Sequence, residues 1–263
     1  MNFVDTHCHI HSLEFFNEAD AEVAFNSAVE AGVTKLVCVA TSLEDSKAAI
    51  AFARKHPENC WATVGIHPHE AKDLTEAQIS SQLQELAQLA DDSKVVGVGE
   101  CGFDFYYNDQ SKDLRKQTQL LKGQLEIAKK YDLPLSFHVR DAFEQFWPVF
   151  EQFKNIRGVL HSFTDSEENL QKALSLGLKI GVNGIATFTT KKWQTDLFRT
   201  INIDNVVLET DAPFLTPKPH RGTINTPENV IYITNYMAEL RGEAKESIAK
   251  ATTASAIKLF NLA

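Results

Sequence analysis

The sequence predicts an α/β fold, a (β/α)₈ barrel, and three observations support that prediction. The chain has 263 residues, close to the roughly 250 of one such barrel. No Pro/Gly/Ser-rich linker divides it, so we expect a single domain over residues 1–263. Eight short apolar runs alternate with amphipathic stretches. Six side chains of the kinds that bind metals lie at the ends of such runs, where a barrel places its active site.

The eight apolar runs are rich in β-forming residues and short enough to be strands. Their nearly continuous hydrophobicity indicates a parallel sheet buried on both faces. Eight β-α repeats favour a closed barrel over an open doubly wound sheet. No GxGxxG follows the first run and no Walker A motif is present, which weakens a nucleotide-binding interpretation. The expected strands are residues 2–5, 35–40, 61–66, 95–99, 133–138, 158–161, 178–182 and 205–209.

The stretches between these runs have the periodicity of amphipathic helices. Ser42, Thr75 and Thr226 precede three of them as N-cap residues. Gly32 and Gly177 follow two others, where a helix commonly ends. The expected helices are residues 19–31, 43–55, 76–89, 114–131, 142–153, 166–176, 191–200, 227–240 and 244–260.

The composition indicates where the protein is located and what it binds weakly. No apolar stretch approaches the roughly 18 residues of a membrane span, and the first residues lack the pattern of a signal peptide, so we expect a cytoplasmic location. The four cysteines form no CxxC pair, which favours reduced thiols. The formal net charge of −9 predicts weak non-specific binding to duplex DNA. It does not exclude a nuclease, because bound cations would supply a local positive field.

Imidazole and carboxylate side chains end or follow five of the expected strands. Each has an ordinary structural explanation when taken alone: a hydrogen-bonded core histidine, an ion-paired glutamate, or an aspartate that caps a turn. Their joint occurrence favours one shared site, because a barrel gathers its strand ends into a ring. Alternation along a strand also places the first two imidazoles on the same face. The six residues are His7, His9, Glu100, His138, His161 and Asp211.

Mixed imidazole and carboxylate ligation suits divalent cations such as Mg, Mn, Zn, Ni or Co. A glutamate after the fourth strand can bridge two cations roughly 3.5–4 Å apart, an arrangement used in phosphoester hydrolysis. Glu100 and Asp211 are therefore the expected catalytic residues, with Asp211 placed to accept a proton from the nucleophilic water. One cation is expected to take His7, His9, Glu100 and Asp211, and the other Glu100, His138 and His161.

Several segments together resemble the TatD family of metal-dependent deoxyribonucleases. They occur in the family's order between about residues 3 and 261, and read VDTHCHIH, GIHP, GECGFD, LPLSFHVRDA, HSFTDS, LETDAPFLTP and ASAIKLFNL. The resemblance implies a TIM barrel of the amidohydrolase type. It also implies divalent-metal-dependent hydrolysis of DNA, with 3′-to-5′ exonuclease action on single strands or 3′ ends, and metal ligands at the six residues above. GECGFD and HSFTDS depart from the family's GEIGLD and HxFTGS, which leaves the substrate's shape open.

Two further residues are expected to bind the substrate. His67 ends the third apolar run, and the resemblance favours its contact with a phosphate or with the nucleophilic water; His69 is expected in a loop. Arg140 follows His138 by two residues, so strand alternation places both on one face. Its guanidinium is expected to hold a phosphate oxygen, with a salt bridge to an acidic neighbour as the alternative.

Other residues near the strand ends have two interpretations each. Aromatic residues after Glu100 either stack on bases of single-stranded DNA or pack at the top of the barrel. The basic segments 191–193 and 218–221 either contact DNA or are solvated surface. Asp104 is a candidate for orienting a metal-bound histidine. The aromatic residues are Phe103, Phe105, Tyr106 and Tyr107.

Two rival functions keep the same ligands. Amidohydrolase-type barrels cleave C–N or C–O bonds, and ester hydrolysis on an aminoacyl-tRNA is one such activity. Many of these barrels bridge their metals with a carboxylated lysine, whereas this chain has Glu100 there. The other rival is a non-catalytic metal-binding protein. Structural sites are usually closed and tetrahedral, and the presence of Asp211 favours catalysis.

Overall fold

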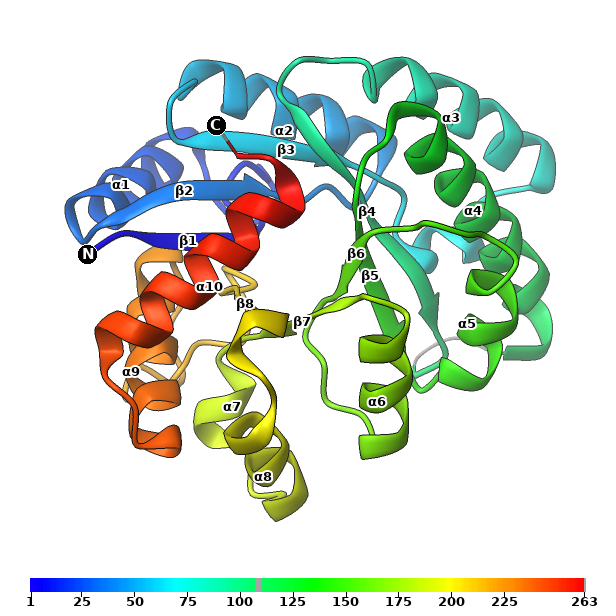
Figure 1. Cartoon of the computed structure of the whole chain (residues 1–263). Coiled ribbons are helices and arrows are strands. Elements are labelled where there is room, and N and C mark those ends of the chain that lie inside the picture. Colours follow the sequence, from blue (N-terminus) through cyan, green and yellow to red (C-terminus); the bar gives the residue numbers. More distant parts are fainter. Residues whose placement is uncertain (107–109, 263) are drawn as a thin grey trace.

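Eight parallel strands form one sheet in sequence order (Figure 1), so the TIM barrel is confirmed. The computed structural model describes residues 1–106 and 110–262. A parallel bridge from Cys8, at the end of the first strand, to Ala212, beyond the last strand, closes the ring. The His9 N–H also donates to the Ala212 carbonyl at 2.8 Å. The strands are β1 (Phe3–Cys8), β2 (Val33–Cys38), β3 (Cys60–Val64), β4 (Val95–Asp104), β5 (Leu135–Arg140), β6 (Gly158–Leu160), β7 (Lys179–Val182) and β8 (Val206–Leu208).

Helices follow the strands and cover the outside of the barrel (Figure 1), and the nine expected helices are present within a few residues of their expected bounds. The helix at residues 185–188 and the 3₁₀ turns at 68–72 and 203–205 were not expected, because three to five residues carry no helical periodicity. The first residues of the expected helix 227–240 form a 3₁₀ turn instead. The helices are α1 (Glu18–Glu30), α2 (Leu43–Lys55), α3 (Glu76–Leu89), α4 (Gln110–Tyr131), α5 (Phe143–Phe150), α6 (Glu167–Ser175), α7 (Ile185–Phe188), α8 (Lys192–Thr200), α9 (Val230–Arg241) and α10 (Lys245–Phe260), and the 3₁₀ turns are η1 (Pro68–Lys72), η2 (Ile203–Asn205) and η3 (Pro227–Asn229).

Local sequence sets several helix ends. The Ser42 side chain accepts the Asp45 N–H at the start of α2. Thr75 begins α3 with a reciprocal capping box. Gly32 and Gly177, just after α1 and α6, have φ of +98° and +79°, which a glycine adopts at little cost. Thr226 precedes the 3₁₀ turn η3 without a side-chain cap bond.

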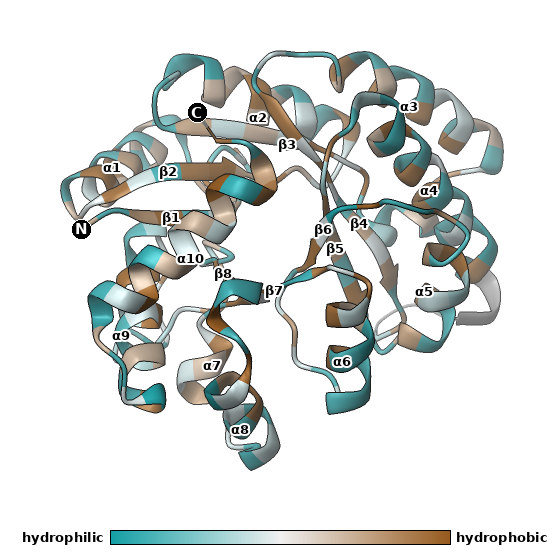
Figure 2. Cartoon of the chain, viewed as in Figure 1, coloured by the Kyte–Doolittle hydropathy of each residue, from teal (hydrophilic) through white to brown (hydrophobic). Residues whose placement is uncertain are grey.

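Helix α10, red in Figure 1, lies beside β1 and β8 and closes the end of the barrel where the strands begin. Its Phe260 is 1% exposed and belongs to a cluster with inward-facing valines of several strands. Figure 2 shows brown residues concentrated along the strands, while the helices carry both brown and teal. The apolar interior therefore occupies the N-terminal half of the barrel and leaves polar side chains to the C-terminal end.

The fourth strand is longer than expected. The prediction ended it at residue 99, but β4 continues to Asp104 because its last residues pair with β5, including Gly102 with His138 and Asp104 with Arg140. Glu100 therefore lies within a strand, and Phe103 is fully buried in it. None of the described helices is long and apolar enough to cross a membrane.

Candidate metal centre

The structure brings all six expected ligands to the C-terminal end of the barrel. Their side chains are buried or half-buried there, although the sequence separates them by up to about 200 residues. They come from five strands or from the residues directly after them: His7 and His9 at the end of β1, Glu100 in β4, His138 in β5, His161 after β6 and Asp211 after β8.

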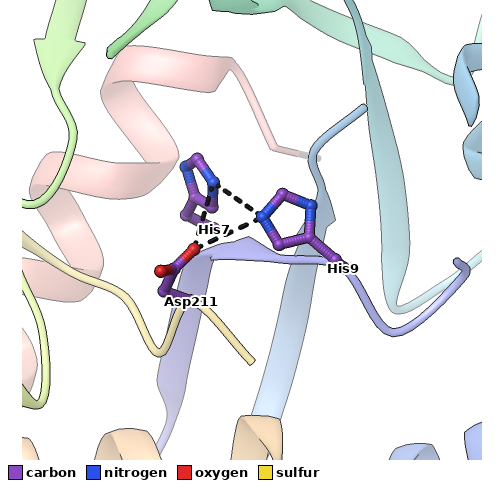
Figure 3. Close-up of side chains that lie close together, drawn as sticks. All are labelled: His7, His9 and Asp211. Carbon is purple, nitrogen blue, oxygen red and sulfur yellow. Dashed lines mark hydrogen bonds and ion pairs between the residues drawn. The ribbon is translucent and has the colours of Figure 1, made fainter. Parts of the chain in front are cut away.

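His7, His9 and Asp211 form one compact group (Figure 3). The two Nε2 atoms are 3.3 Å apart, and Asp211 Oδ1 lies 3.6 Å from that of His7 and 3.3 Å from that of His9. His9 Nδ1 lies 2.8 Å from the Val39 carbonyl, which can only accept, so Nδ1 carries the proton and Nε2 has its lone pair toward the group. Two nitrogens and a carboxylate oxygen thus converge on one point, as cation ligands do.

Glu100 lies between two sets of histidines. Its Oε2 is 3.4 Å from His7 Nε2 and 3.9 Å from His9 Nε2. Its Oε1 is 2.7 Å from His138 Nδ1 and 3.9 Å from His161 Nε2. The two carboxylate oxygens therefore serve different histidines, which is the arrangement that a bridging ligand requires.

Asp104 orients His138, as the sequence indicated. Its Oδ2 lies 2.8 Å from His138 Nε2, which directs the other nitrogen, Nδ1, toward Glu100. The same oxygen is 3.0 Å from Nε2 of His69, a residue expected in a loop but found in the turn η1. The Asp104 carboxyl is fully buried and also accepts the Tyr106 N–H.

Glu209 orients His161 as Asp104 orients His138, and the sequence analysis did not identify it. Its Oε1 is 2.9 Å from His161 Nδ1 and accepts the Ser162 N–H. Its Oε2 is buried without a hydrogen-bond partner among the described residues. A Cβ on Gly181 would lie 2.4 Å from that oxygen, so a glycine in β7 makes room for it. The signal available in the sequence was a second carboxylate in LETD, two residues before Asp211.

His67 has the geometry of a hydrogen-bond donor. Its Nε2 lies 3.6 Å from Glu100 Oε1, within a group of potential ligands that includes His138. However, its Nδ1 accepts the His69 N–H at 3.1 Å, so Nδ1 carries no proton. A neutral imidazole with an accepting Nδ1 has its hydrogen on Nε2. His67 therefore presents an N–H to the centre, which suits a substrate oxygen better than a cation.

Burial and neighbouring charges shift the pKa values of the side chains in this centre in opposite directions. Burial raises the pKa of Glu100, but the neighbouring histidines outweigh it and hold that pKa well below its usual range. Burial lowers the pKa of His138, yet hydrogen bonds to Asp104 and Glu100 raise it to about 9. Burial likewise lowers the pKa of His161, and the charges of Glu209 and Asp211 raise it to about 10. The anionic pocket thus favours bound positive charge.

The backbone of β4 holds Glu100 close to its neighbours. Gly99 and Gly102 have φ of +140° and +150°, a conformation that other residues rarely adopt. A Cβ on Gly99 would lie 2.5 Å from the Ser136 carbonyl oxygen, and one on Gly102 would lie 1.9 Å from that of His138. Glycine at both positions therefore permits the close approach of the β4 and β5 backbones.

Asp5 fixes the ends of β1 and β8 to each other. Its Oδ1 accepts the N–H groups of Thr210 and His7 at 2.9 Å and 3.2 Å, and its Oδ2 accepts the Thr210 hydroxyl at 2.6 Å. These bonds lock the backbone next to His7 and Asp211. His11 is buried, with its Nε2 3.2 Å from Asp45 Oδ1.

The remaining predicted substrate contacts surround the centre. Arg140 is exposed, and its guanidinium stacks 3.7 Å from the ring centre of Tyr106. Phe105 packs against the core, and Tyr107 lies outside the described residues. Arg221 lies over the Phe188 ring and donates to a backbone carbonyl, a structural role for segment 218–221.

An aromatic pair at the edge of the centre was not foreseen. Phe15 and Phe214 are 39% and 44% exposed and lie 4.9 Å apart between ring centres. Phe214 also contacts the His9 ring at 6.2 Å. No local pattern indicates this pair, because the two residues are 199 positions apart on loops.

The donor set fits divalent cations. Among the described residues, three groups of His, Asp and Glu side chains have potential ligand atoms within 4.8 Å of one another. Two of the groups contain His7, and the third contains Glu100. The imidazoles are directed by partners on their far nitrogens, as in protein metal sites. Nitrogen and oxygen donors in this mixture suit first-row transition metals and Mg.

Comparisons with known proteins agree with this centre. The model of the family described as TatD related DNase matches residues 4–261. The 3'-5' ssDNA/RNA exonuclease TatD of Erwinia tasmaniensis is 34% identical over 250 residues, covering 92% of this chain and 94% of that protein. The uncharacterized metal-dependent hydrolase YabD of Bacillus subtilis is 30% identical and covers 98% of both chains.

A solved structure gives the same result. The crystal structure of YJJV, a TatD homolog from Escherichia coli K12, superposes with a TM-score of 0.88 at 31% identity, over 99% of this chain and 98% of that one. The hydrolase of the TatD family from Entamoeba histolytica, at 22% identity and a TM-score of 0.87, shares the fold. The chain is therefore an enzyme of the TatD related DNase family.

Proposed function

We propose that the enzyme hydrolyses phosphodiester bonds of single-stranded DNA from the 3′ end, with two divalent cations. The observation that carries this proposal is the placement of Glu100, whose two oxygens face separate histidine sets. A bridging carboxylate is the central ligand of two-metal phosphoester hydrolases. Relatives named 3'-5' ssDNA/RNA exonuclease support the substrate and the polarity, and RNA is included on the same ground.

The distances favour a division of the six ligands between two cations. Bound there, the cations would lower the pKa of a water molecule, hold phosphate oxygens and stabilise the charge of the transition state. Mg, Mn and Zn all suit these donors. One cation would be held by His7, His9, Glu100 and Asp211, and the other by Glu100, His138 and His161.

The chain's own side chains supply the remaining steps. Burial raises the pKa of Asp211, but nearby histidines outweigh it and lower that pKa, so the side chain is an available proton acceptor for the attacking water. His67 offers its Nε2–H to a phosphate oxygen. Arg140, two residues beyond His138, offers a guanidinium to the next phosphate along the strand.

A labelled single strand tests this proposal. We expect shortening of 5′-end-labelled DNA that requires Mg²⁺, Mn²⁺ or Zn²⁺, and immediate release of a mononucleotide from 3′-end-labelled DNA. Asp211→Asn should lower kcat by about 10²- to 10⁴-fold, while Asp91→Asn, an exposed matched control, should leave it unchanged. Hydrolysis of acyl esters alone would instead establish the amidohydrolase-type rival, and an inactive but metal-stabilised protein the non-catalytic one.

We also propose a cytoplasmic location. Cys8, Cys38, Cys60 and Cys101 are all buried free thiols. Unpaired cysteines are typical of proteins in reducing compartments.

A further inference from the structure

A groove lies beside the metal centre, beyond the ends of four successive strands. Its volume is about 640 Å³. It is bordered by Tyr106 after β4, by the end of β5, by residues 164–167 after β6, and by the start of α8. That volume is within the range of small-ligand sites. Four of its residues carry rings or positive charge, namely Tyr106, Arg140, Lys191 and Trp193.

Two exposed aromatic rings border this groove. Tyr106 is 53% exposed and Trp193 is 43% exposed. Each has a cation over its ring: Arg140 lies 3.7 Å from the centre of Tyr106, and the Lys191 amine lies 5.9 Å from that of Trp193. Exposed rings next to cations are the elements with which proteins stack bases and hold the adjoining phosphates.

The groove adjoins the metal centre. Arg140 follows His138 by two residues on β5, which is about 7 Å along a strand. The backbone of Tyr106 is held at the end of β4, because its N–H donates at 2.9 Å to the Asp104 carboxylate. The same carboxylate is the partner of His138. A polymer with one end at the centre therefore reaches these rings with its next units.

Charge in the groove is nearly balanced. Arg140 and Lys191 face three acidic residues, of which Asp165 accepts hydrogen bonds from Ser166 N–H and Asn169. The other two are Asp141 and Glu167. Phosphate attraction is therefore weak here, and ring stacking must supply most of the affinity.

We propose that this groove binds the single-stranded nucleic acid on the 5′ side of the cleaved bond, by stacking bases on Tyr106 and Trp193. The proposal rests on the proposed nuclease function for its occupant. Stacking does not depend on the identity of the base, so the groove holds strands of any sequence while the metal centre removes their ends. Stacking also requires no net positive charge, so it allows a protein of net charge −9 to hold a polyanion.

Direct binding and turnover test the groove separately. In the presence of a chelator, which prevents turnover, an oligonucleotide should quench the fluorescence of Trp193. Quenching would report on Trp193 because Trp61 and Trp147 are buried. A strand with abasic residues in place of its bases should quench little. In the metal-loaded enzyme, Tyr106→Ala and Trp193→Ala should each raise KM for the normal strand by about 5- to 150-fold, and Trp193→Phe should restore most of the loss.

Three controls isolate the stacking. The alanine variants should hydrolyse a small phosphodiester, bis(4-nitrophenyl) phosphate, at the wild-type kcat. Leu176→Ala, which removes an equally exposed apolar side chain just past the far end of α6, should change nothing. With about two cations in contact, the log–log slope of binding against salt should be no steeper than about −1.4.

Two results would contradict the proposed binding of nucleic acid in the groove. Equal binding of normal and abasic strands by the wild type is one, and an unchanged KM in the double alanine variant is the other. Both can occur in an active nuclease, so they leave the proposed function intact. Conversely, base-dependent quenching by a protein that hydrolyses no phosphodiester would support the groove and reject the nuclease.

Discussion

At the scale of residues, the partner of each histidine decides which nitrogen faces the centre. The Val39 carbonyl holds Nδ1 of His9, and Glu209 holds Nδ1 of His161, so both offer Nε2. Asp104 holds Nε2 of His138, which offers Nδ1. Such partners fix the tautomer and increase the basicity of a ligand. The carboxylates behind the histidines therefore contribute to metal affinity without touching the metal.

The first prediction concerns Glu209. Glu209→Gln keeps the volume and an acceptor oxygen beside His161 but removes the negative charge, so affinity for Mn²⁺ or Zn²⁺ should fall by about 10- to 100-fold. Competition with a chromophoric chelator measures that affinity. Glu239→Gln on the exposed side of α9 is the matched control. If both variants bind metal as the wild type does, Glu209 has no positioning role.

At the scale of elements, β4 is the strand on which the centre depends. It carries Glu100 and Asp104, and its glycines let it approach β5 so closely that His138 lies between those two carboxylates. A strand with side chains at Gly99 or Gly102 could not make this approach, because its own Cβ atoms would overlap backbone carbonyls.

A second prediction follows for Gly102. Gly102→Ala combines an unfavourable φ with a severe overlap on the His138 carbonyl, so the free energy of unfolding should fall by ~3 kcal/mol or more. Gly177→Ala is the control, since its φ is also positive but nothing lies within 4 Å of the added Cβ; its cost should be ~1–2 kcal/mol. Urea unfolding compares them, and equal losses would contradict the role assigned to the close approach.

At the scale of the whole molecule, the barrel separates stability from chemistry. Its N-terminal end is filled with apolar side chains and closed by α10. Its C-terminal end gathers buried histidines and carboxylates whose charges must be balanced. Without a cation, protons on histidines supply that balance, as the raised pKa values of His138 and His161 indicate.

The stability of the metal-free protein should therefore fall at alkaline pH. The pKa of His138 is raised to about 9 and that of His161 to about 10 in the fold, above the ordinary 6.5. Their contribution is complete below about pH 6.5 and is lost as pH rises through 9 to 10. In a chelator, Tm should drop by about 5 °C or more between pH 7 and 9.5.

The metal-loaded protein is the control for this pH dependence. Histidine ligands bind metal in the neutral form, so binding at pH 7 should release protons and the drop in Tm should be much smaller. An equal drop with and without metal would show that other groups cause it.

The barrel could be predicted from the sequence alone, because eight β-α repeats of the right length permit few other arrangements. The six residues that gather could also be predicted, since strand ends converge in any such barrel. The single domain remains a prediction, as do the roles of these residues.

The way in which those residues face one another could not be predicted from the sequence. Four features depend on contacts between distant segments: the extension of β4, the pairing of Glu209 with His161, the proton on His67 Nε2, and the position of Tyr106 and Trp193 on one groove. Periodicity reports which face of an element is buried, whereas these features depend on register, glycine-permitted approach and hydrogen bonds across the barrel. The physical reason is that such contacts are settled by packing, which no local pattern encodes.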